Sequence, residues 1–382
     1  MGLDTEFKTP GQLIDKLLSE RDWTQKFLAF LLDVSEDIVS RIIVGKRPVD
    51  AEMALRLGEA FNTDPERFLR LQQRFDLNKA NIVRIPDPAR ATRAELFGEL
   101  RVPEMIRRNW LDVDDPNDMP AVEKELMRFF NAPSLDQIEV LRFAAKQTKT
   151  NIDPTPVQVA WLRRVTAIAK DILVPRKYTE FLGRKAVKEM QDLIYAPSEA
   201  RKVPRILIEA GIRFVIVEGL PTAGIDGVCF WLDDNSPVIA LTMRFDRNDN
   251  FWFVVRHECE HVLKGHGKQD DIYIVDNLEG SRAGTGPDIE EEERMANEAA
   301  AEFCVPKKKM DKFVAVKAPF FSEKDLLGFA KTIKVHPGIV AGRLQYETGR
   351  YDRFRNHQVK MRSIITPNAY VDGWGNVYPL EK

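Results

Sequence analysis

Two histidines spaced four residues apart are the clearest chemical signal in the chain. They stand in the segment His257-Glu258-Cys259-Glu260-His261. Residues four apart lie about one turn apart on one face of a helix, so both imidazoles can bind a single Zn²⁺. Glu258 follows the first histidine and can reach a water molecule at the ion, where it would act as general base. Because the chain has only 5 histidines, this arrangement predicts a metallopeptidase site rather than a chance pairing.

A third protein ligand must come from outside this segment. One class of zinc peptidases takes a histidine six residues after the second histidine, with a glycine midway. Here Lys264 stands in place of that glycine and Gly267 in place of that histidine. Gly265 and His266 lie nearby at the wrong offsets, so the third ligand has to come from another helix.

Four consecutive glutamates at residues 290–293 are the alternative donors. Glu293 is the first choice, because Ala296 and Ala300 on nearby faces of its helix would allow close packing against the metal helix. Glu292 is the second choice. The remaining glutamates are expected to form a solvated acidic face at a helix N-terminus, where the helix dipole favours negative charge.

The elements that would position these residues are visible as changes in apolar pattern. Three short β-rich segments lie at 212–217, 227–232 and 238–242, and helices are expected at 251–264 and 289–304. Turn-forming residues at 233–237 predict that the second and third strands form a hairpin. The fold class predicted for the chain is therefore α+β, with a small sheet beside the metal helix.

The N-terminal part of the chain is a compact helical unit. Thr24 and Ser35 are expected N-caps of two short helices separated only by Asp33-Val34. Two helices joined so tightly predict a helix-turn-helix. We therefore divide the chain into a helix-turn-helix domain at 1–78, a proline-punctuated helical connector at 79–155, a zinc peptidase domain at 156–350 and a C-terminal extension at 351–382.

Composition sets few limits on function. The chain has 382 residues, a net charge of −2 and 44% hydrophobic residues, values ordinary for a globular protein. Its 3 cysteines do not suggest a disulfide framework, which favours a reducing compartment. The chain contains no apolar run of the ~20 residues needed to span a membrane, and its start lacks the apolar core of a signal peptide. We expect a cytoplasmic protein with no membrane partner.

The metal segment and its surroundings resemble the ImmA/IrrE family of metallo-endopeptidases. The resemblance rests on three stretches, IDGVCFWLDDNSPVIALTMRFDRNDNFWFVVRHECEH at 225–261, ERMANEAAAEFCVP at 293–306 and VHPGIVAGRLQ at 335–345. It implies a zincin-like domain in which Glu293 is the third ligand. It also implies cleavage of a regulatory protein inside the cell, often a helix-turn-helix repressor.

Two residues within the metal motif depart from that family. Small or apolar residues usually fill the two middle positions, whereas Cys259 and Glu260 stand there in this chain. We expect Glu260 to face outward and leave catalysis intact. Cys259 could be a redox switch, but a buried structural thiol is the favoured interpretation.

The N-terminal unit resembles the XRE-type helix-turn-helix of HigA-like antitoxins. The matching stretches are TPGQLI at 9–14, DWTQKFLA at 22–29 and VSRIIVGKRPV at 39–49. HigA-like domains fused to ImmA/IrrE-like domains form a familiar architecture, so the two resemblances support each other. The candidate DNA-contacting residues are Gln25, Ser40, Arg41, Lys46 and Arg47.

Acidic residues argue against DNA binding by this unit. Residues 1–78 hold 11 Lys and Arg against 14 Asp and Glu, a balance of 11 − 14 = −3. Glu36 and Asp37 begin the recognition helix, where base contacts are normally made and acidic groups repel phosphates. The competing interpretation is a helix-turn-helix used for dimerisation or for recognising a protein partner.

Peptide hydrolysis also needs a group that stabilises the oxyanion. His336 precedes an expected helix at Pro337, and we predict that it lies near the metal without binding it, although capping of that helix is an equal alternative. His266 is its rival for the oxyanion role, and Tyr346 is a weaker one.

Together these features predict a cytoplasmic zinc metallo-endopeptidase with one Zn²⁺ per chain, a site that can also accommodate Mn²⁺. Its expected substrate is a helix-turn-helix regulator or a cognate toxin or antitoxin, in a toxin–antitoxin, prophage or stress-response circuit. Promoter DNA and a second copy of the chain, as a homodimer, are the other expected partners. The alternative function is a DNA-binding repressor or antitoxin whose zincin-like domain senses a ligand or binds a partner, but such a module would not need Glu258.

Overall fold

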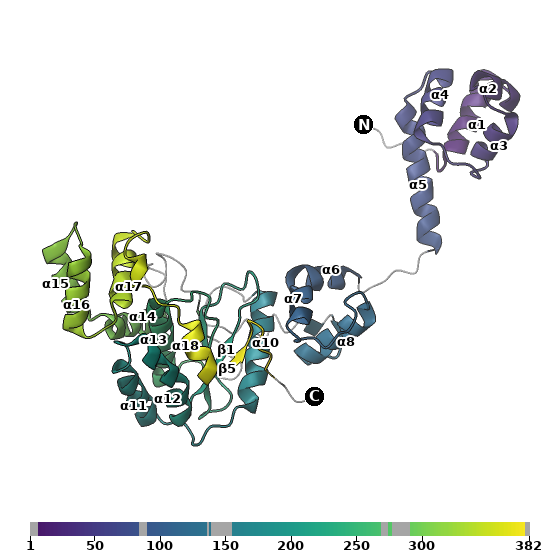
Figure 1. Cartoon of the computed structure of the whole chain (residues 1–382). Coiled ribbons are helices and arrows are strands. Elements are labelled where there is room, and N and C mark those ends of the chain that lie inside the picture. Colours follow the sequence, from purple (N-terminus) through teal and green to yellow (C-terminus); the bar gives the residue numbers. More distant parts are fainter. Residues whose placement is uncertain are drawn as a thin grey trace. The chain divides into compact units, whose positions relative to one another are not determined.

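A computed structural model describes residues 7–83, 90–135, 137–138, 155–268, 274–276 and 291–378. Contacts divide the chain into two compact units, Met1–Pro88 and Ala89–Lys382, which we call unit 1 and unit 2. Unit 1 is all helical, and unit 2 combines a small sheet with many helices, so the predicted α+β class is confirmed (Figure 1). Within the described residues, no helix combines the length and apolar character needed to cross a bilayer.

Five helices around one apolar core form unit 1. They are α1 (Pro10–Arg21), α2 (Gln25–Leu31), α3 (Glu36–Ile43), α4 (Ala51–Phe61) and α5 (Pro65–Val83). The side chain of Thr24 accepts a hydrogen bond from the Phe27 N–H and so caps α2, as predicted. Ser35 stands at the N-cap of α3 but makes no capping hydrogen bond with its side chain. The turn between α2 and α3 places Asp33 in the left-handed region, with φ 53°.

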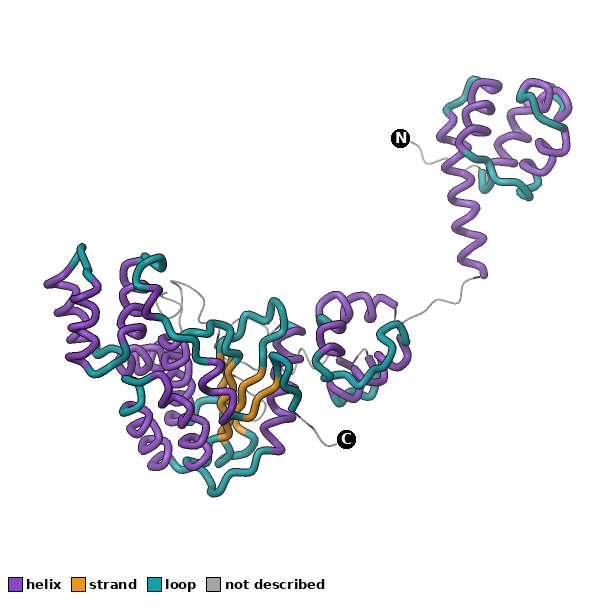
Figure 2. Tube along the Cα trace, viewed as in Figure 1, coloured by secondary structure: helices purple, strands orange, loops and turns teal. Residues whose placement is uncertain are grey.

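Unit 2 is built around a five-stranded sheet. Its strands are β1 (Arg213–Val217), β2 (Gly227–Trp231), β3 (Pro237–Leu241), β4 (Ile274–Asp276) and β5 (Tyr370–Asp372), in the order β4-β2-β3-β1-β5. The predicted hairpin is confirmed, because β2 and β3 pair antiparallel. β1 pairs parallel with both β3 and β5. Figure 2 shows these strands between layers of helices.

Helices cover both faces of the sheet. The first of them are α6 (Arg90–Glu99), α7 (Val102–Arg107), α8 (Met119–Phe130), α10 (Pro156–Asp171), α11 (Glu180–Gln191) and α12 (Val203–Glu209). The helices of unit 2 that follow β3 in the chain are α13 (Asn248–Lys264), α14 (Glu291–Cys304), α15 (Lys307–Lys317), α16 (Glu323–Ile333), α17 (Pro337–Thr348) and α18 (Arg362–Ile365). Short 3₁₀ turns lie at Pro197–Lys202, Arg355–His357 and Thr366–Asn368.

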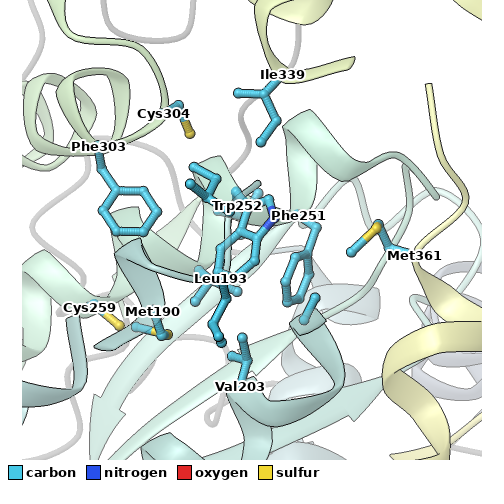
Figure 3. Close-up of a cluster of buried hydrophobic side chains, with 14 of the residues drawn as sticks. Met190, Leu193, Val203, Phe251, Trp252, Cys259, Phe303, Cys304, Ile339 and Met361 are labelled. Carbon is cyan, nitrogen blue, oxygen red and sulfur yellow. The ribbon is translucent and has the colours of Figure 1, made fainter. Parts of the chain in front are cut away.

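Alternating side chains of the strands divide the core of unit 2 into two clusters. Along β1, Phe214 and Ile216 enter the cluster formed with α11 to α17, while Val215 and Val217 enter the cluster formed with α7, α8 and α10. Phe251 and Trp252 of α13 lie in the middle of the first cluster (Figure 3). Both faces of the sheet are thus buried, and the position of α13 is set by close packing.

The connector helices pack on the sheet rather than standing apart. Met105 and Phe130 are buried in the same apolar cluster as the β1 residue Val215. The guanidinium of Arg108 also donates a hydrogen bond of 2.7 Å to the carbonyl of Glu218, just after β1. Residues 139–154, at the end of the predicted connector, lie outside the described residues. The domain boundaries at 78, 155 and 350 stay predictions.

The C-terminal segment supplies a strand that the sequence did not reveal. β5 pairs with β1, with Val215 opposite Tyr370. A buried ion pair fastens it, because Arg164 of α10 donates to the carboxylate of Asp372, and the two side chains are 4% and 1% exposed. Arg164 also donates to the Tyr378 carbonyl at 3.1 Å. A turn follows β5, because Gly373 and Asn376 exchange backbone hydrogen bonds.

This ion pair yields a stability prediction. Arg164→Ala should lower the free energy of unfolding by about 3–5 kcal/mol, because it leaves a buried carboxylate without its cation. Urea unfolding of the full chain would measure the loss. Arg184→Ala is the matched control, since Arg184 forms an exposed pair with Glu180, and it should cost less than about 1 kcal/mol. Equal losses in the two variants would show that the buried pair does not stabilise unit 2.

Candidate metal centre

Helix α13 carries the predicted metal motif in the interior of unit 2. His257, Glu258 and His261 are all 0% exposed. The helix ends at Gly265, which takes the left-handed conformation with φ 69° that favours glycine. This turn brings the chain back, so that the His266 N–H donates to the His261 carbonyl at 2.9 Å.

The two histidines and Glu293 of α14 converge on one point. The Nε2 atoms of His257 and His261 lie 3.0 Å apart. The Glu293 carboxylate oxygens lie 3.4 Å from each of these nitrogens, Oε2 from His257 and Oε1 from His261. A tetrahedral ion with bonds of about 2.0–2.1 Å spaces its ligand atoms roughly 3.3 Å apart. The three donors therefore fit a zinc ion that keeps one open position, and within the described residues they are the one group of this kind.

Close approach of α14 to α13 makes this convergence possible. Ala296 and Ala300 of α14 are fully buried, and small side chains there let the two helices approach each other closely. Glu292, the alternative ligand, lies instead 3.9 Å from the Nδ1 atom of His266. The geometry therefore favours Glu293 over Glu292.

Burial keeps His261 in the protonation state that a metal needs. Desolvation, reinforced by the neighbouring His257, lowers the pKa of His261 to about 3. A neutral imidazole is the form that binds zinc, so the site does not have to lose a proton from His261 at neutral pH.

Glu258 lies where α13 crosses the first residue of β2. A Cβ atom on Gly227 would overlap the Glu258 carboxylate and press against Val254. Only glycine therefore lets the strand pass beneath this carboxylate. The sequence analysis missed Gly227, and its one signal was a glycine at the start of an otherwise apolar strand.

His266 contacts the metal motif, whereas His336 does not lie beside it. The Nδ1 atoms of His266 and His261 are 2.9 Å apart, so His266 orients this ligand from the side away from His257. The ring of His336 caps α17 by accepting from the Gly338 N–H at 3.1 Å, and it contacts Asn248 at 2.9 Å. Asn248 precedes His257 by nine residues, or about 13 Å along a helix.

The expectation that His336 lies near the metal is therefore wrong. The capping alternative is the one that the structure supports, because the ring is used at the N-terminus of α17. Tyr346 lies further along the same helix and lines a cavity beside the site.

The C-terminal motif VHPGIVAGRLQ has a packing role that was not expected. Gly338 and Gly342 face α13, where a Cβ atom would overlap Asn248 and Asp249 respectively. Glycines four apart on α17 thus let it pack directly on the start of α13. The resemblance at 335–345 reflects how the metal helix is held.

Cys259 and Glu260, the two motif residues that are unusual for the family, fit into the structure without altering the arrangement of the two histidines. Cys259 is 2% exposed, and burial raises the pKa of its thiol to about 12, which suits a structural residue. Glu260 forms an ion pair of 2.7 Å with Arg256, and both side chains are 12% exposed. Glu260 is therefore more buried than expected, and Arg256 neutralises it.

In unit 1 the candidate DNA-contacting residues occupy two places. Gln25 begins α2, while Arg41, Lys46 and Arg47 gather at the end of α3, where both the Lys46 and Arg47 N–H groups donate to the Arg41 carbonyl. These three cationic residues are exposed, and Ser40 is half-buried. Glu36 and Asp37 stand at the opposite end of α3. Arg41 lies 3.4 Å from Asp37, but so exposed a pair is weak and screened by salt.

Comparisons with known proteins agree with this two-part architecture. Residues 14–68 match the family model described as helix-turn-helix, and residues 209–345 match the peptidase family model described as IrrE N-terminal-like domain. The two matches lie in the order that the sequence predicted, with the helix-turn-helix first, so the resemblance stated from the sequence is confirmed.

Individual relatives cover only a small part of the chain. Virulence-associated protein A′ of Dichelobacter nodosus is 42% identical over 71 residues, which are 18% of this chain and 62% of that protein. The uncharacterized HTH-type transcriptional regulator YddM of Escherichia coli is 28% identical over 71 residues, 19% of this chain and 76% of that protein. A structure of the Pseudomonas aeruginosa antitoxin HigA with the higBA promoter is 33% identical over 21% of this chain and 95% of its own, with a TM-score of 0.19.

The contact between His266 and His261 predicts an effect on metal affinity. His266→Ala should weaken zinc binding by roughly 10–100-fold, because the ligand loses the neighbour that orients it. Competition with a zinc chelator would measure this. His336→Ala is the control and should leave the affinity unchanged, since His336 caps α17. If the two variants bound zinc equally, His266 would have no orienting role.

Proposed function

We propose that unit 2 is a zinc metallo-endopeptidase. The observation that carries the proposal is the convergence of His257, His261 and Glu293 to separations of 3.0–3.4 Å, with Glu258 buried beside them. Three protein ligands of this type are characteristic of catalytic zinc sites, which keep a position open for the reaction. A structural zinc site would instead use four protein ligands.

Each residue of the group then has a separate task. A bound zinc would supply a Lewis acid that polarises the substrate carbonyl and makes water acidic enough to ionise near neutral pH. Glu258 takes the proton from the attacking water and passes it to the leaving amine. Gly227 leaves room for the Glu258 carboxylate, and His266 fixes the orientation of His261. Burial of all three motif residues excludes competing water.

The resemblance of residues 209–345 to the IrrE N-terminal-like domain supports a proposal for the substrate class. We propose that the enzyme acts in the cytoplasm on a regulatory protein, namely a helix-turn-helix repressor, toxin or antitoxin. The circuit would be of the toxin–antitoxin, prophage or stress-response type, and the chain would work as a homodimer. Zinc is the proposed native metal, although Mn²⁺ also suits a site of two histidines and a glutamate.

We also propose that unit 1 binds promoter DNA. The support is the helix-turn-helix family match together with the exposed cations Arg41, Lys46 and Arg47 at one end of α3. The acidic residues Glu36 and Asp37 at the other end weaken contacts with phosphates. Binding would therefore be modest and strongly dependent on salt, and it would bring the peptidase close to a DNA-bound substrate.

Replacing the general base tests the peptidase directly. Glu258→Gln should keep the zinc and the fold but lower turnover by at least ~10²–10⁴-fold, the usual effect of removing general base catalysis. Cleavage of the product of a neighbouring regulatory gene would be followed by mass spectrometry. Glu260→Gln, on the same helix, is the control and should stay active. Full cellular complementation by Glu258→Gln would instead favour a sensor or partner-binding domain.

Replacing a cation of α3 tests the DNA proposal. Arg41→Ala should weaken binding to the gene's own promoter by about 1–3 kcal/mol if Arg41 contacts a base. Binding would be measured by fluorescence anisotropy at a low salt concentration of ~50 mM. Arg70→Ala, an exposed arginine on α5, is the control. If the wild-type chain binds no site under these conditions, unit 1 recognises a protein rather than DNA.

A further inference from the structure

A large cavity lies beside the metal group in unit 2. It measures about 840 Å³ and is lined by residues of α13, α14 and α17, with Phe245 before α13 and Tyr351 after α17 completing its wall. Cavities of 300–1,000 Å³ are typical of ligand-binding sites. Neither the metal ligands nor Glu258 is among the lining residues, so this space is distinct from the metal group itself.

The cavity and the metal group nevertheless share side chains at their boundary. Phe253 lines the cavity, and its ring also stacks on the metal ligand His257 with a centroid separation of 6.3 Å. Asn297 lines the cavity one helical turn after Glu293. The cavity wall therefore includes residues that adjoin the metal ligands His257 and Glu293.

The charges on the cavity wall are already balanced by partners within the fold. Arg247 pairs with Asp249 at 2.7 Å, Arg294 with Glu291 at 2.7 Å, Lys307 with Asp311 at 2.8 Å and Arg343 with Glu347 at 2.7 Å. The Glu302 carboxylate accepts from the backbone N–H of Lys307 at 2.8 Å. The remaining lining carboxylate, that of Glu298, lies 3.8 Å from Arg294. A charged ligand would have to compete with these pairs.

The rest of the cavity wall that could recognise a ligand is apolar. Phe245, Phe253, Ile339 and Tyr346 contribute rings and a branched side chain to the wall. Phe245 and Tyr346 are 40% and 37% exposed, a large exposure for aromatic side chains. Burying them against a ligand would therefore contribute favourable free energy in proportion to the area covered.

One polar group on the wall is suited to a peptide backbone. The Asn297 Oδ1 atom is buried and has no hydrogen-bond partner among the residues that the structure describes. A buried acceptor of this kind costs free energy unless a donor reaches it. A backbone N–H of an extended substrate is such a donor, and the same amide can donate to a substrate carbonyl.

We propose that this cavity is the specificity pocket of the peptidase, which accepts a large apolar or aromatic side chain next to the scissile bond while Asn297 binds the adjacent backbone. The inference rests on the proposed peptidase function. The inference narrows the substrate to polypeptides that carry such a residue next to the cleaved bond.

The test compares two substitutions of alanine by tryptophan. Ala301 lines the cavity on α14, so Ala301→Trp fills it, whereas Ala315 lies exposed on α15 away from the wall. Zinc-loaded full-length protein is incubated with a synthetic peptide library that holds every amino acid at each position, and the new termini are sequenced by mass spectrometry. Binding of N-acetyl-phenylalanine amide to each variant is measured in parallel by nuclear magnetic resonance.

We expect the wild type and Ala315→Trp to cleave beside Phe, Tyr, Leu or Met. In Ala301→Trp, the rate of cleavage beside these large residues should fall by about 10-fold or more relative to the rate beside small residues. This variant should also no longer bind the amide. Asn297→Leu, which removes the hydrogen bond but keeps the size, should raise KM for the preferred peptides.

Three other results would overturn the proposal. Cleavage with no preference for apolar residues, or with the same preference in both tryptophan variants, would show that the cavity is not the specificity pocket. The proposed peptidase function would still stand. Binding of the amide without cleavage by any variant would make the cavity a small-molecule site. If no variant cleaved a peptide and none bound the amide, both the pocket assignment and the proposed peptidase function would be wrong.

Discussion

The architecture of unit 2 depends on bringing one carboxylate to two imidazoles inside an apolar core. Glu293 approaches the Nε2 atoms of both histidines to 3.4 Å although it belongs to a different helix. Such a short separation between helices requires small residues at the contact, and Ala296 and Ala300 provide them. It also requires that α13 cannot shift, because a displacement of about 1 Å would spoil the coordination. Helices α11, α14 and α17 and the strands β2 and β3 all pack on α13 and hold it in place.

The same constraint explains the glycines around the motif. Gly227 lets β2 pass beneath Glu258, and Gly338 and Gly342 let α17 meet the side chains of Asn248 and Asp249. Gly265 ends α13 so that His266 folds back onto His261. Gly227, Gly338 and Gly342 each allow one element to approach the metal helix more closely than a residue with a side chain would. The pattern is that of a site whose polar atoms are positioned by backbone contacts rather than by long side chains.

Local signals made a large part of this arrangement predictable. The spacing of His257 and His261, the acidic start of the next helix and the turn residues of the hairpin all act over a few positions, and the structure places them as expected. Long-range contacts could not be predicted in this way. His336 was placed near the metal because histidines are scarce, but its position depends on how α17 crosses α13, which no local pattern encodes. The contact of Phe253 with His257 and the cavity beyond it likewise arise only from packing.

The fifth strand also lay beyond such local signals, and its position has a consequence for how unit 2 forms. Arg164 and Asp372, which fasten β5, are 208 positions apart, so this contact closes a very long loop of chain. Contacts of high sequence separation form late and slow the overall folding rate. During synthesis, α13 and α14 emerge well before Tyr370, while one edge of β1 still lacks its partner. A ribosome-bound chain would therefore carry His257, His261 and Glu293 on helices packed against a sheet that is still open along one side, and the metal group would lie in a complete fold only after β5 has paired with β1.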